Sequence, residues 1–143
     1  MRAIMLLIFL LCLLSSVNAS ALDREIVYKT LIAEAVSEGE TGMRAVACVI
    51  RNRSAINNLR VEDVIAKGFY GSKRKDLDEF VNNQGARYTK LARRIVKEIF
   101  IEDYPDVTNG ATHFENIKAF GVPYWAKDMK QVAKIGSHTF WKE

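Results

Sequence analysis

The chain has 143 residues, 49% of them apolar and 27% charged, and a formal net charge of +4. This composition is ordinary for a globular protein and suits one leader segment followed by one domain with a core that needs no disulfides. Both signs of charge are mixed along the chain and no nucleic-acid-binding motif accompanies them, so nucleic acid is not an expected partner. The short runs of Lys and Arg are explained most simply as residues on surfaces that face solvent. Attraction of these runs to a polyanion is the alternative.

The N-terminus carries the pattern of a secretory signal peptide. Arg2 precedes an apolar run at residues 3–14, and small residues end the segment at Ala19. We therefore predict a signal peptide at residues 1–19 and a mature domain at residues 20–143. The run is shorter than the roughly twenty residues that span a bilayer, so we expect no stable membrane anchor after cleavage and a secreted or periplasmic location. An uncleaved anchor is the alternative.

Four helices follow from the spacing of apolar residues in the domain. They are predicted at residues 23–36, 42–57, 61–66 and 88–99. Cys48 lies in the second helix and is the only cysteine left after the leader, so it has no internal disulfide partner and is expected to pack as a small apolar residue.

The rest of the domain is expected to be irregular or extended. Residues 68–83 are polar and contain glycine, which predicts a long surface loop. Residues 111–115 and 137–141 contain aromatic residues and alternate between apolar and polar side chains, so the two segments could pair as antiparallel strands. The segment between them, residues 123–133, is predicted to turn into a helix. The fold class is therefore α+β, mostly helical, with a small antiparallel sheet.

Glu34 is the first candidate for chemistry. It lies among apolar neighbours at the end of a helix that faces the core, where burial should raise the pKa of its carboxyl group. A carboxyl that stays protonated at neutral pH can donate a proton to the leaving oxygen of a glycosidic bond. If the helix continues, Glu38 shares a face with Glu34 and raises this pKa further. A Glu at such a position is, however, often only the solvent face of an amphipathic helix.

The two histidines and the aromatic pairs give weaker signals. His113 and His138 each lie in a predicted strand beside an aromatic residue, without the spacing of a metal site, so polar groove or structural roles are more plausible than metal binding. Trp125 could belong to the core or line a sugar groove, where an apolar ring face suits a carbohydrate. No metal or cofactor is predicted.

Three stretches of the sequence resemble a known family in the right order. Residues 33–53 (AEAVSEGETGMRAVACVIRNR) are similar to the opening motif of cell wall hydrolases of the spore cortex-lytic enzyme (SleB) type. Residues 123–126 (PYWA) with residues 135–140 (IGSHTF) are similar to its closing motif, and residues 111–114 (ATHF) to a looser middle one. The resemblance spans nearly the whole predicted mature domain, and the first motif is specific.

This resemblance implies a fold and a reaction. The fold would be lysozyme-like, and the substrate would be peptidoglycan, cut at the β-1,4 bond between N-acetylmuramic acid and N-acetylglucosamine. The resemblance places the catalytic glutamate at Glu34 and a second motif glutamate, also assigned to catalysis, at Glu38. The substrate-binding candidates are Tyr70, His113, Phe114, Trp125 and His138. Tyr70 and His113 occupy positions where the family often has other aromatic residues, which leaves subsite preference open.

Three functions follow from these observations. A lytic transglycosylase needs one carboxyl group, Glu34, which first protonates the leaving oxygen and then takes a proton from the 6-hydroxyl of the muramic sugar. A muramidase lets water attack and normally uses a second carboxylate, for which Glu38 and Glu115 are the candidates. We favour the transglycosylase, acting as a monomer. A secreted protein that binds peptidoglycan without cleaving it is the rival from another class.

Overall fold

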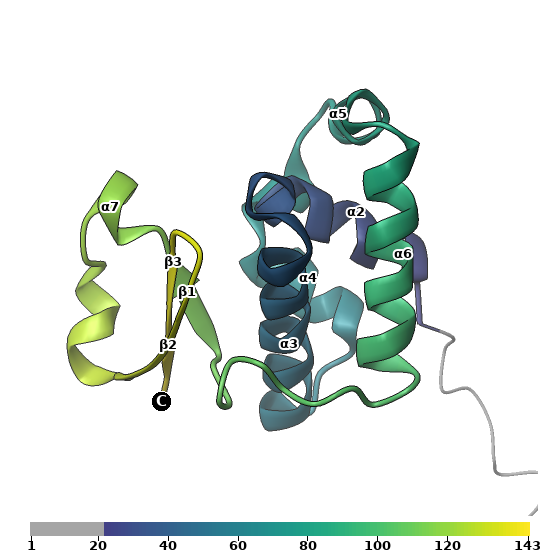
Figure 1. The fold of residues 1–143 in the computed structure, drawn as a ribbon. Coiled ribbons are helices and arrows are strands. Elements are labelled where there is room, and N and C mark those ends of the chain that lie inside the picture. The colour runs from purple at the N-terminus through teal and green to yellow at the C-terminus, as the bar shows by residue number, and fades with distance from the viewer. Residues whose placement is uncertain (1–21) are drawn as a thin grey trace, which may run out of the picture.

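The computed structural model describes residues 22–143, so the predicted signal peptide lies outside the described residues. Most of the described chain is helical (Figure 1). The helical elements before the sheet are α2 (Arg24–Ala35), η1 (Val36–Glu38), α3 (Gly39–Asn57), α4 (Val61–Gly68), η2 (Tyr70–Lys73), α5 (Leu77–Gln84) and α6 (Ala86–Phe100). The four predicted helices are therefore confirmed, with ends that differ by a few residues.

The first helix begins where its sequence provides a cap. The carboxylate of Asp23 accepts hydrogen bonds from the backbone N–H groups of Glu25 (3.0 Å) and Ile26 (3.2 Å), which satisfies two donors that the first helical turn leaves free. Farther along α2, Leu31 and Ile32 are fully buried. The cap fixes the start of the helix, and burial of these residues fixes the face that it turns to the core.

The core lies between α2, α3 and α6. Helix α3 passes through the middle of the molecule, with α6 on one side and the sheet on the other (Figure 1). Cys48 of α3 is fully buried, as predicted for a small apolar residue, and its thiol has a raised pKa because it is removed from solvent. Each of the largest buried side chains removes apolar surface from water, at roughly 1.5–3 kcal/mol per side chain.

The chain breaks between α2 and α3 rather than continuing as one helix. Helix α2 ends at Ala35, a short 3-10 turn follows, and Gly39 has φ of 67°, a left-handed conformation that favours glycine. The expectation that Glu34 and Glu38 share a helix face is therefore wrong, because the two residues lie on opposite sides of this break.

The segment predicted as a loop at residues 68–83 contains two helical elements, η2 and α5. Leu77, Phe80 and Val81 of α5 fall at i, i+3 and i+4 and turn toward the core, with Val81 fully in the interior. This short amphipathic pattern is hard to recognise in the sequence because polar residues lie between the three apolar ones. It is sufficient for a two-turn helix when α6 and α2 provide a surface against which it can pack.

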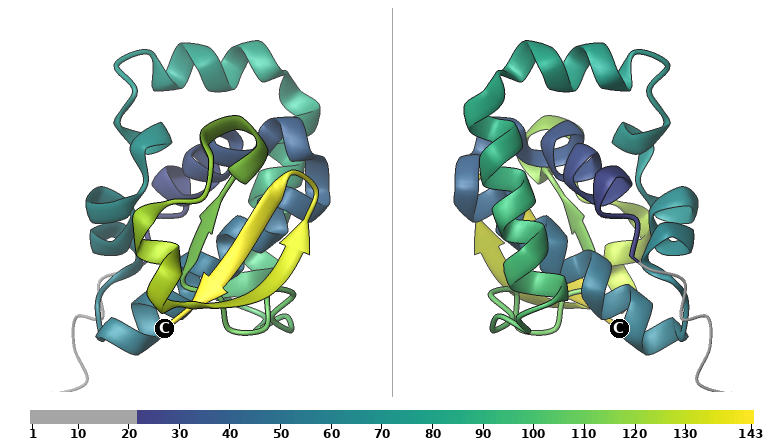
Figure 2. Two further views of the ribbon diagram at one scale, coloured as in Figure 1. Left: turned by 90° about the vertical axis from the view of Figure 1, so that its left-hand side faces the viewer. Right: turned by 90° about the vertical axis from the view of Figure 1, so that its right-hand side faces the viewer.

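The sheet has three antiparallel strands in the order β1-β3-β2, with β1 (His113–Glu115), β2 (Lys130–Ile135) and β3 (His138–Lys142). The predicted pairing of the two aromatic segments is confirmed, and Phe114 lies opposite Phe140. Figure 2 shows the sheet on the side of the molecule away from α6. The two remaining helical elements, α7 (Ile117–Phe120) and η3 (Tyr124–Asp128), connect β1 to β2.

The helix predicted within residues 123–133 is wrong, because only η3 is helical and β2 follows it. Gly136 and Ser137 form a two-residue loop that joins β2 to β3, and Gly136 has φ of 59°. A glycine at the first central position suits the tight turn of a β-hairpin. This turn returns the chain onto β2, so residues from Lys130 onward extend as a strand. The α+β class, mostly helical with a small antiparallel sheet, is confirmed.

Within residues 22–143, none of the helices combines the length and the apolar character that crossing a bilayer requires.

Candidate functional site

Glu34 lies in the last turn of α2, where η2 crosses the helix. Its Oε1 atom accepts a hydrogen bond of 2.7 Å from the backbone N–H of Gly71. A Cβ atom on Gly71 would stand 2.8 Å from this oxygen and 2.9 Å from the Cβ of Ala33. Only a glycine lets the backbone come this close. The contact therefore depends on the residue type at position 71 as well as on Glu34.

Burial raises the pKa of the Glu34 carboxyl above its ordinary value. The Gly71 N–H and the positive charge of Arg53 act in the opposite direction, and the negative charge of Glu115 adds to the rise. Burial dominates because the neutral carboxyl loses less hydration than the carboxylate does. The structure thus gives Glu34 the shifted pKa that its apolar sequence context predicted.

Arg53 connects Glu34 to the first strand. Its guanidinium group lies 5.0 Å from the centre of the Phe69 ring, and its Nε atom donates to the carbonyl oxygen of Thr112. Burial lowers the pKa of Arg53, and the charge of Glu34 opposes this effect. Arg53 is the last residue of the opening motif at residues 33–53, and the structure places its side chain as a brace between Glu34 and the chain that enters β1.

The turn before β1 is held by a second residue of the same helix. Asn52 donates from Nδ2 to the carboxylate of Asp106 and to the carbonyl oxygen of Ala111, both at 2.9 Å. Asp106 also accepts from the backbone N–H groups of Thr108 and Gly110, at 2.7 and 2.8 Å. Although burial raises the pKa of Asp106, its hydrogen bonds lower it by more. The network fixes the direction in which the chain enters β1.

Glu38 binds the β2–β3 hairpin rather than supporting Glu34. Its Oε2 atom accepts from the backbone N–H of Ser137 at 3.0 Å, and its Oε1 atom accepts from the hydroxyl of the same residue. These bonds lower the pKa of Glu38, so the expectation that it would raise the pKa of Glu34 is wrong. The carboxylate whose charge does act on Glu34 is Glu115 of β1. A catalytic role of Glu38 stays a prediction, and the structure gives it a structural one.

Two of the predicted substrate-binding residues belong to an aromatic cluster. The Phe114 ring lies 6.2 Å from that of Phe69, 5.7 Å from that of Phe140 and 5.1 Å from the His138 ring, measured between centroids. Burial lowers the pKa of His138, which favours the neutral form of its imidazole. Its Nδ1 atom is buried and has no hydrogen-bond partner among the described residues.

His113 and Trp125 form a second aromatic group. Their rings lie 5.1 Å apart, and the Trp125 ring meets that of Trp141 edge-on at 5.2 Å. Burial lowers the pKa of His113, and the charge of Arg53 lowers it further. Arg53 therefore acts electrostatically on both His113 and Glu34. The Trp125 ring is half-buried against these two rings, and its role in binding a sugar stays a prediction.

Tyr70 stands at the surface beside the residue that holds Glu34. Its side chain is 83% exposed, and the ammonium group of Lys73 lies 5.2 Å from the centre of its ring. It directly precedes Gly71 in η2. Tyr70 thus offers an exposed aromatic ring beside the residue that binds Glu34, and its role in binding a sugar stays a prediction.

Sequence reasoning did not identify Gly71, and it did not identify Ser137. Both act through backbone N–H groups at sequence separations of 37 and 99 residues from the carboxylates that they bind. No local pattern signals such contacts, although the Gly136-Ser137 pair does signal a hairpin loop. Among residues 22–143, no three His, Cys, Asp or Glu side chains are grouped as they would be to hold a metal ion.

Comparisons with known proteins give the family. A family model described as Cell Wall Hydrolase matches residues 37–141. Among solved structures, the chain is similar to the catalytic domain of the germination-specific lytic transglycosylase SleB from Bacillus anthracis, with a TM-score of 0.62 and 22% identity. The match covers 88% of this chain and 100% of that one. No curated protein matches the chain.

The structural similarity confirms the predicted lysozyme-like fold. The family match spans most of the chain, from the end of η1 through α3 and on to all but the last residue of β3, while Glu34 lies three residues before the match begins. The chain belongs to the cell wall hydrolase family, and it is an enzyme that acts on the peptidoglycan of the cell wall.

Proposed function

We propose that the protein is a lytic transglycosylase that cleaves the β-1,4 bond between N-acetylmuramic acid and N-acetylglucosamine, with Glu34 as its catalytic acid. The observation that carries this proposal is the buried carboxyl group of Glu34, whose pKa is raised by burial and whose Oε1 atom is held by the Gly71 N–H. Family membership supports the substrate, and the likeness to the SleB catalytic domain supports the choice of reaction.

The hydrogen bond from Gly71 determines which oxygen carries the proton. Because Oε1 already accepts an N–H, the proton of the neutral carboxyl is on Oε2. This proton is donated to the glycosidic oxygen as the bond to the muramic sugar breaks. An oxocarbenium-like centre then develops on C1 of that sugar.

The second half of the reaction uses the same side chain. Glu34 is now a carboxylate, and the Gly71 N–H and the charge of Arg53 stabilise this form. The carboxylate takes the proton from the 6-hydroxyl, and the resulting oxygen bonds to C1 to close a 1,6-anhydro ring. Glu34 regains its proton and no water is consumed. The contacts that lower its pKa therefore have a function in the second step, while burial prepares the first.

One observation favours a muramidase as the alternative. The charge of Glu115 acts on Glu34 across the site, and a second carboxylate near the acid is what a hydrolytic mechanism uses to activate water or stabilise the sugar cation. Glu38 is less suited to this role because Ser137 engages both of its oxygens. The muramidase would therefore use Glu115.

The experiment that decides is digestion of purified sacculi, with the released muropeptides separated by mass. The proposal expects anhydro-muropeptides from the wild type and from Glu79→Gln, an exposed control of the same chemistry, and none from Glu34→Gln. Reducing products from the wild type, lost in Glu115→Gln, would establish the muramidase. Binding of sacculi without any product from the wild type would leave a non-catalytic binding protein.

We also propose that the enzyme acts outside the cytoplasm as a monomer. Support comes from the signal-peptide pattern of residues 1–19 and from the location of a cell wall substrate. Mass spectrometry of the protein recovered from cells would show a mature N-terminus after Ala19, and sedimentation would give the mass of one mature chain. An N-terminus at Met1 in the membrane fraction would show an uncleaved anchor instead.

A further inference from the structure

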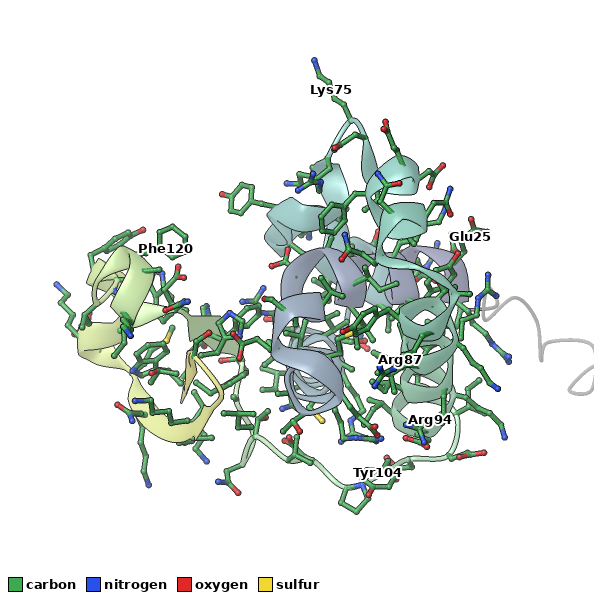
Figure 3. All side chains as sticks on the ribbon, turned by 45° about the horizontal axis from the view of Figure 1, so that its top comes forward. Glu25, Lys75, Arg87, Arg94, Tyr104 and Phe120 are labelled. Atoms are coloured by element: carbon green, nitrogen blue, oxygen red, sulfur yellow. The ribbon has the colours of Figure 1, made fainter. Side chains whose placement is uncertain are left out.

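Helix α6 lies on the side of the molecule away from the sheet (Figure 1), and its sequence carries a row of cations. Arg87, Lys90 and Arg93 follow one another at intervals of three residues, and Arg94 lies one turn from Lys90. Arg87 and Arg94, labelled in Figure 3, are separated by about 10 Å along the helix axis. None of the hydrogen bonds or charges that act on Glu34 comes from this helix.

Three of these cations have no acidic partner within residues 22–143. Among the described residues, no carboxylate lies within ion-pair distance of Arg87, Lys90 or Arg93. Arg93 instead stacks over the Tyr28 ring at 4.3 Å, which fixes its guanidinium group at the surface. Arg94, by contrast, pairs with Glu40 at 2.8 Å. The positive charge of the first three is therefore available to a ligand.

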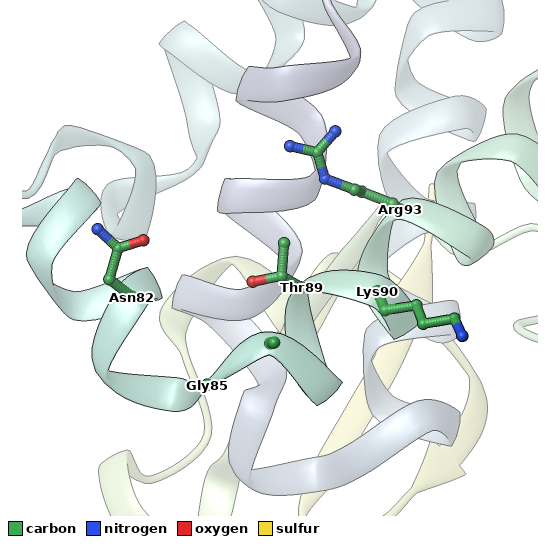
Figure 4. Close-up of a pocket in the computed structure, with 6 residues that line it drawn as sticks. Asn82, Gly85, Thr89, Lys90 and Arg93 are labelled. Carbon is green, nitrogen blue, oxygen red and sulfur yellow. The ribbon is translucent and has the colours of Figure 1, made fainter.

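The cations surround two hollows of the surface. The first lies between α5 and α6 and is lined by Asn82, Gly85, Ala86, Thr89, Lys90 and Arg93 (Figure 4). None of the described residues that line it is acidic, and they offer an amide, a hydroxyl and two cations. The second is lined by Glu40, Arg87, Lys90, Leu91 and Arg94. Lys90 lines both, so the hollows adjoin along the helix.

We propose that this face of α6 binds a linear, phosphate-bearing polyanion of the cell envelope, with one phosphate in the hollow beside Arg93 and others along the row of cations. Guanidinium groups match the geometry of phosphate oxygens, and the unpaired positive charge complements a repeating negative one. The surface would hold the enzyme on the wall while the separate site around Glu34 cleaves glycan strands.

A linear polymer fits better than a lipid membrane. No large apolar side chain between residues 71 and 100 is exposed, whereas a helix that lies in a membrane surface presents apolar side chains to the acyl region. The hollows are open grooves beside a helix, which a flexible chain can enter and a flat bilayer surface cannot.

The test measures binding of long-chain inorganic polyphosphate to the purified protein over a range of NaCl concentrations, and it needs no catalytic turnover. A triple variant, Arg87→Gln with Lys90→Gln and Arg93→Gln, removes the unpaired cations. The matched control, Lys118→Gln with Lys127→Gln and Lys130→Gln, removes the same charge from exposed lysines near the sheet. Melting curves establish that both variants fold.

We expect the triple variant to bind at least tenfold more weakly at low salt. We also expect its slope of log affinity against log salt to fall by about two, since roughly 0.7 counterions are released for each phosphate neutralised. The control should stay within about threefold of the wild type. Lys90→Glu alone leaves the Arg93–Tyr28 contact intact and should weaken binding severalfold. Equal weakening in the control, or binding to phosphatidylglycerol vesicles but not to polyphosphate, would overturn the proposal.

Discussion

The contact between Gly71 and Glu34 gives the sharpest test of the site, through the substitution Gly71→Ala. The added methyl group would lie 2.8 Å from Glu34 Oε1, 2.9 Å from Ala33 Cβ and 3.2 Å from the carbonyl carbon of Ala33. The first two distances are shorter than side-chain contacts allow, and the neighbours belong to a buried helix. The segment η2 must therefore move away from α2, and the 2.7 Å hydrogen bond to Glu34 must lengthen or break.

Two effects of this movement can be given magnitudes. Overpacking of this kind costs about 1–3 kcal/mol, which for a domain of this size lowers Tm by roughly 4–12 °C. Displacement of a catalytic group by about 1 Å can cost on the order of 100-fold in rate. The pKa of Glu34 should also rise further, because the Gly71 N–H that lowers it is withdrawn. The alkaline limb of the activity profile should then move to higher pH.

The assay combines thermal unfolding with the pH dependence of kcat/KM on solubilised glycan strands. Lys73→Ala is the control, because Lys73 lies in the same short helix and is exposed; its Tm should stay within about 2 °C of the wild type. If Gly71→Ala keeps both the wild-type Tm and the wild-type pH profile, the close approach of η2 to Glu34 does not exist as described. Loss of stability with an unchanged pH profile would show that the hydrogen bond does not act on Glu34.

Three further predictions concern the groups around this contact. Arg53→Met removes the donor to the Thr112 carbonyl oxygen and a positive charge near Glu34. Unfolding by urea should show that the free energy of unfolding falls by about 1–3 kcal/mol. The alkaline limb of the activity profile should again move to higher pH. Hydrogen bonds from Ser137 lower the pKa of Glu38. The stability that Glu38 contributes is therefore present above about pH 4.3 and is lost as the pH falls through the pKa of Glu38 in the folded protein. Glu38→Gln should lower Tm more at pH 7 than at pH 3. Burial raises the pKa of Glu34. The contribution of Glu34 to stability is therefore present below about pH 4.3 and is lost as the pH rises through the pKa of Glu34 in the folded protein. Glu34→Gln should raise Tm relative to the wild type at pH 8 and leave Tm unchanged at pH 4.

The helices were predictable because local rules and tertiary packing agree along them. The apolar residues of α2, α3 and α6 recur with helical spacing, and Asp23 caps the first of these helices. The errors lie where a tertiary contact decides. Helix α5 has only two turns and depends on its neighbours, and β2 forms because the Gly136-Ser137 loop pairs it with β3.

The candidate site divides in the same way. Glu34 could be identified from its apolar neighbours, and Phe114 and His138 from the aromatic strands. Gly71 could not, because its contribution is a backbone N–H brought to Glu34 from a segment that the sequence indicated as a loop. The placement of Arg53 between Glu34 and β1 likewise depends on the turn that Asp106 organises.

The break after Ala35 explains how two glutamates four residues apart come to differ. In one continuous helix, Glu34 and Glu38 would face the same way, and each charge would disfavour the other. Because α2 ends between them, Glu34 stays with the buried end of the helix and its pKa rises, while Glu38 turns to the hairpin and its pKa falls. Two carboxyl groups whose pKa values differ in this way can take different roles. One keeps its proton, and the other keeps its negative charge. The chain geometry thus supports Glu34 as the acid and Glu38 as the anchor of the sheet.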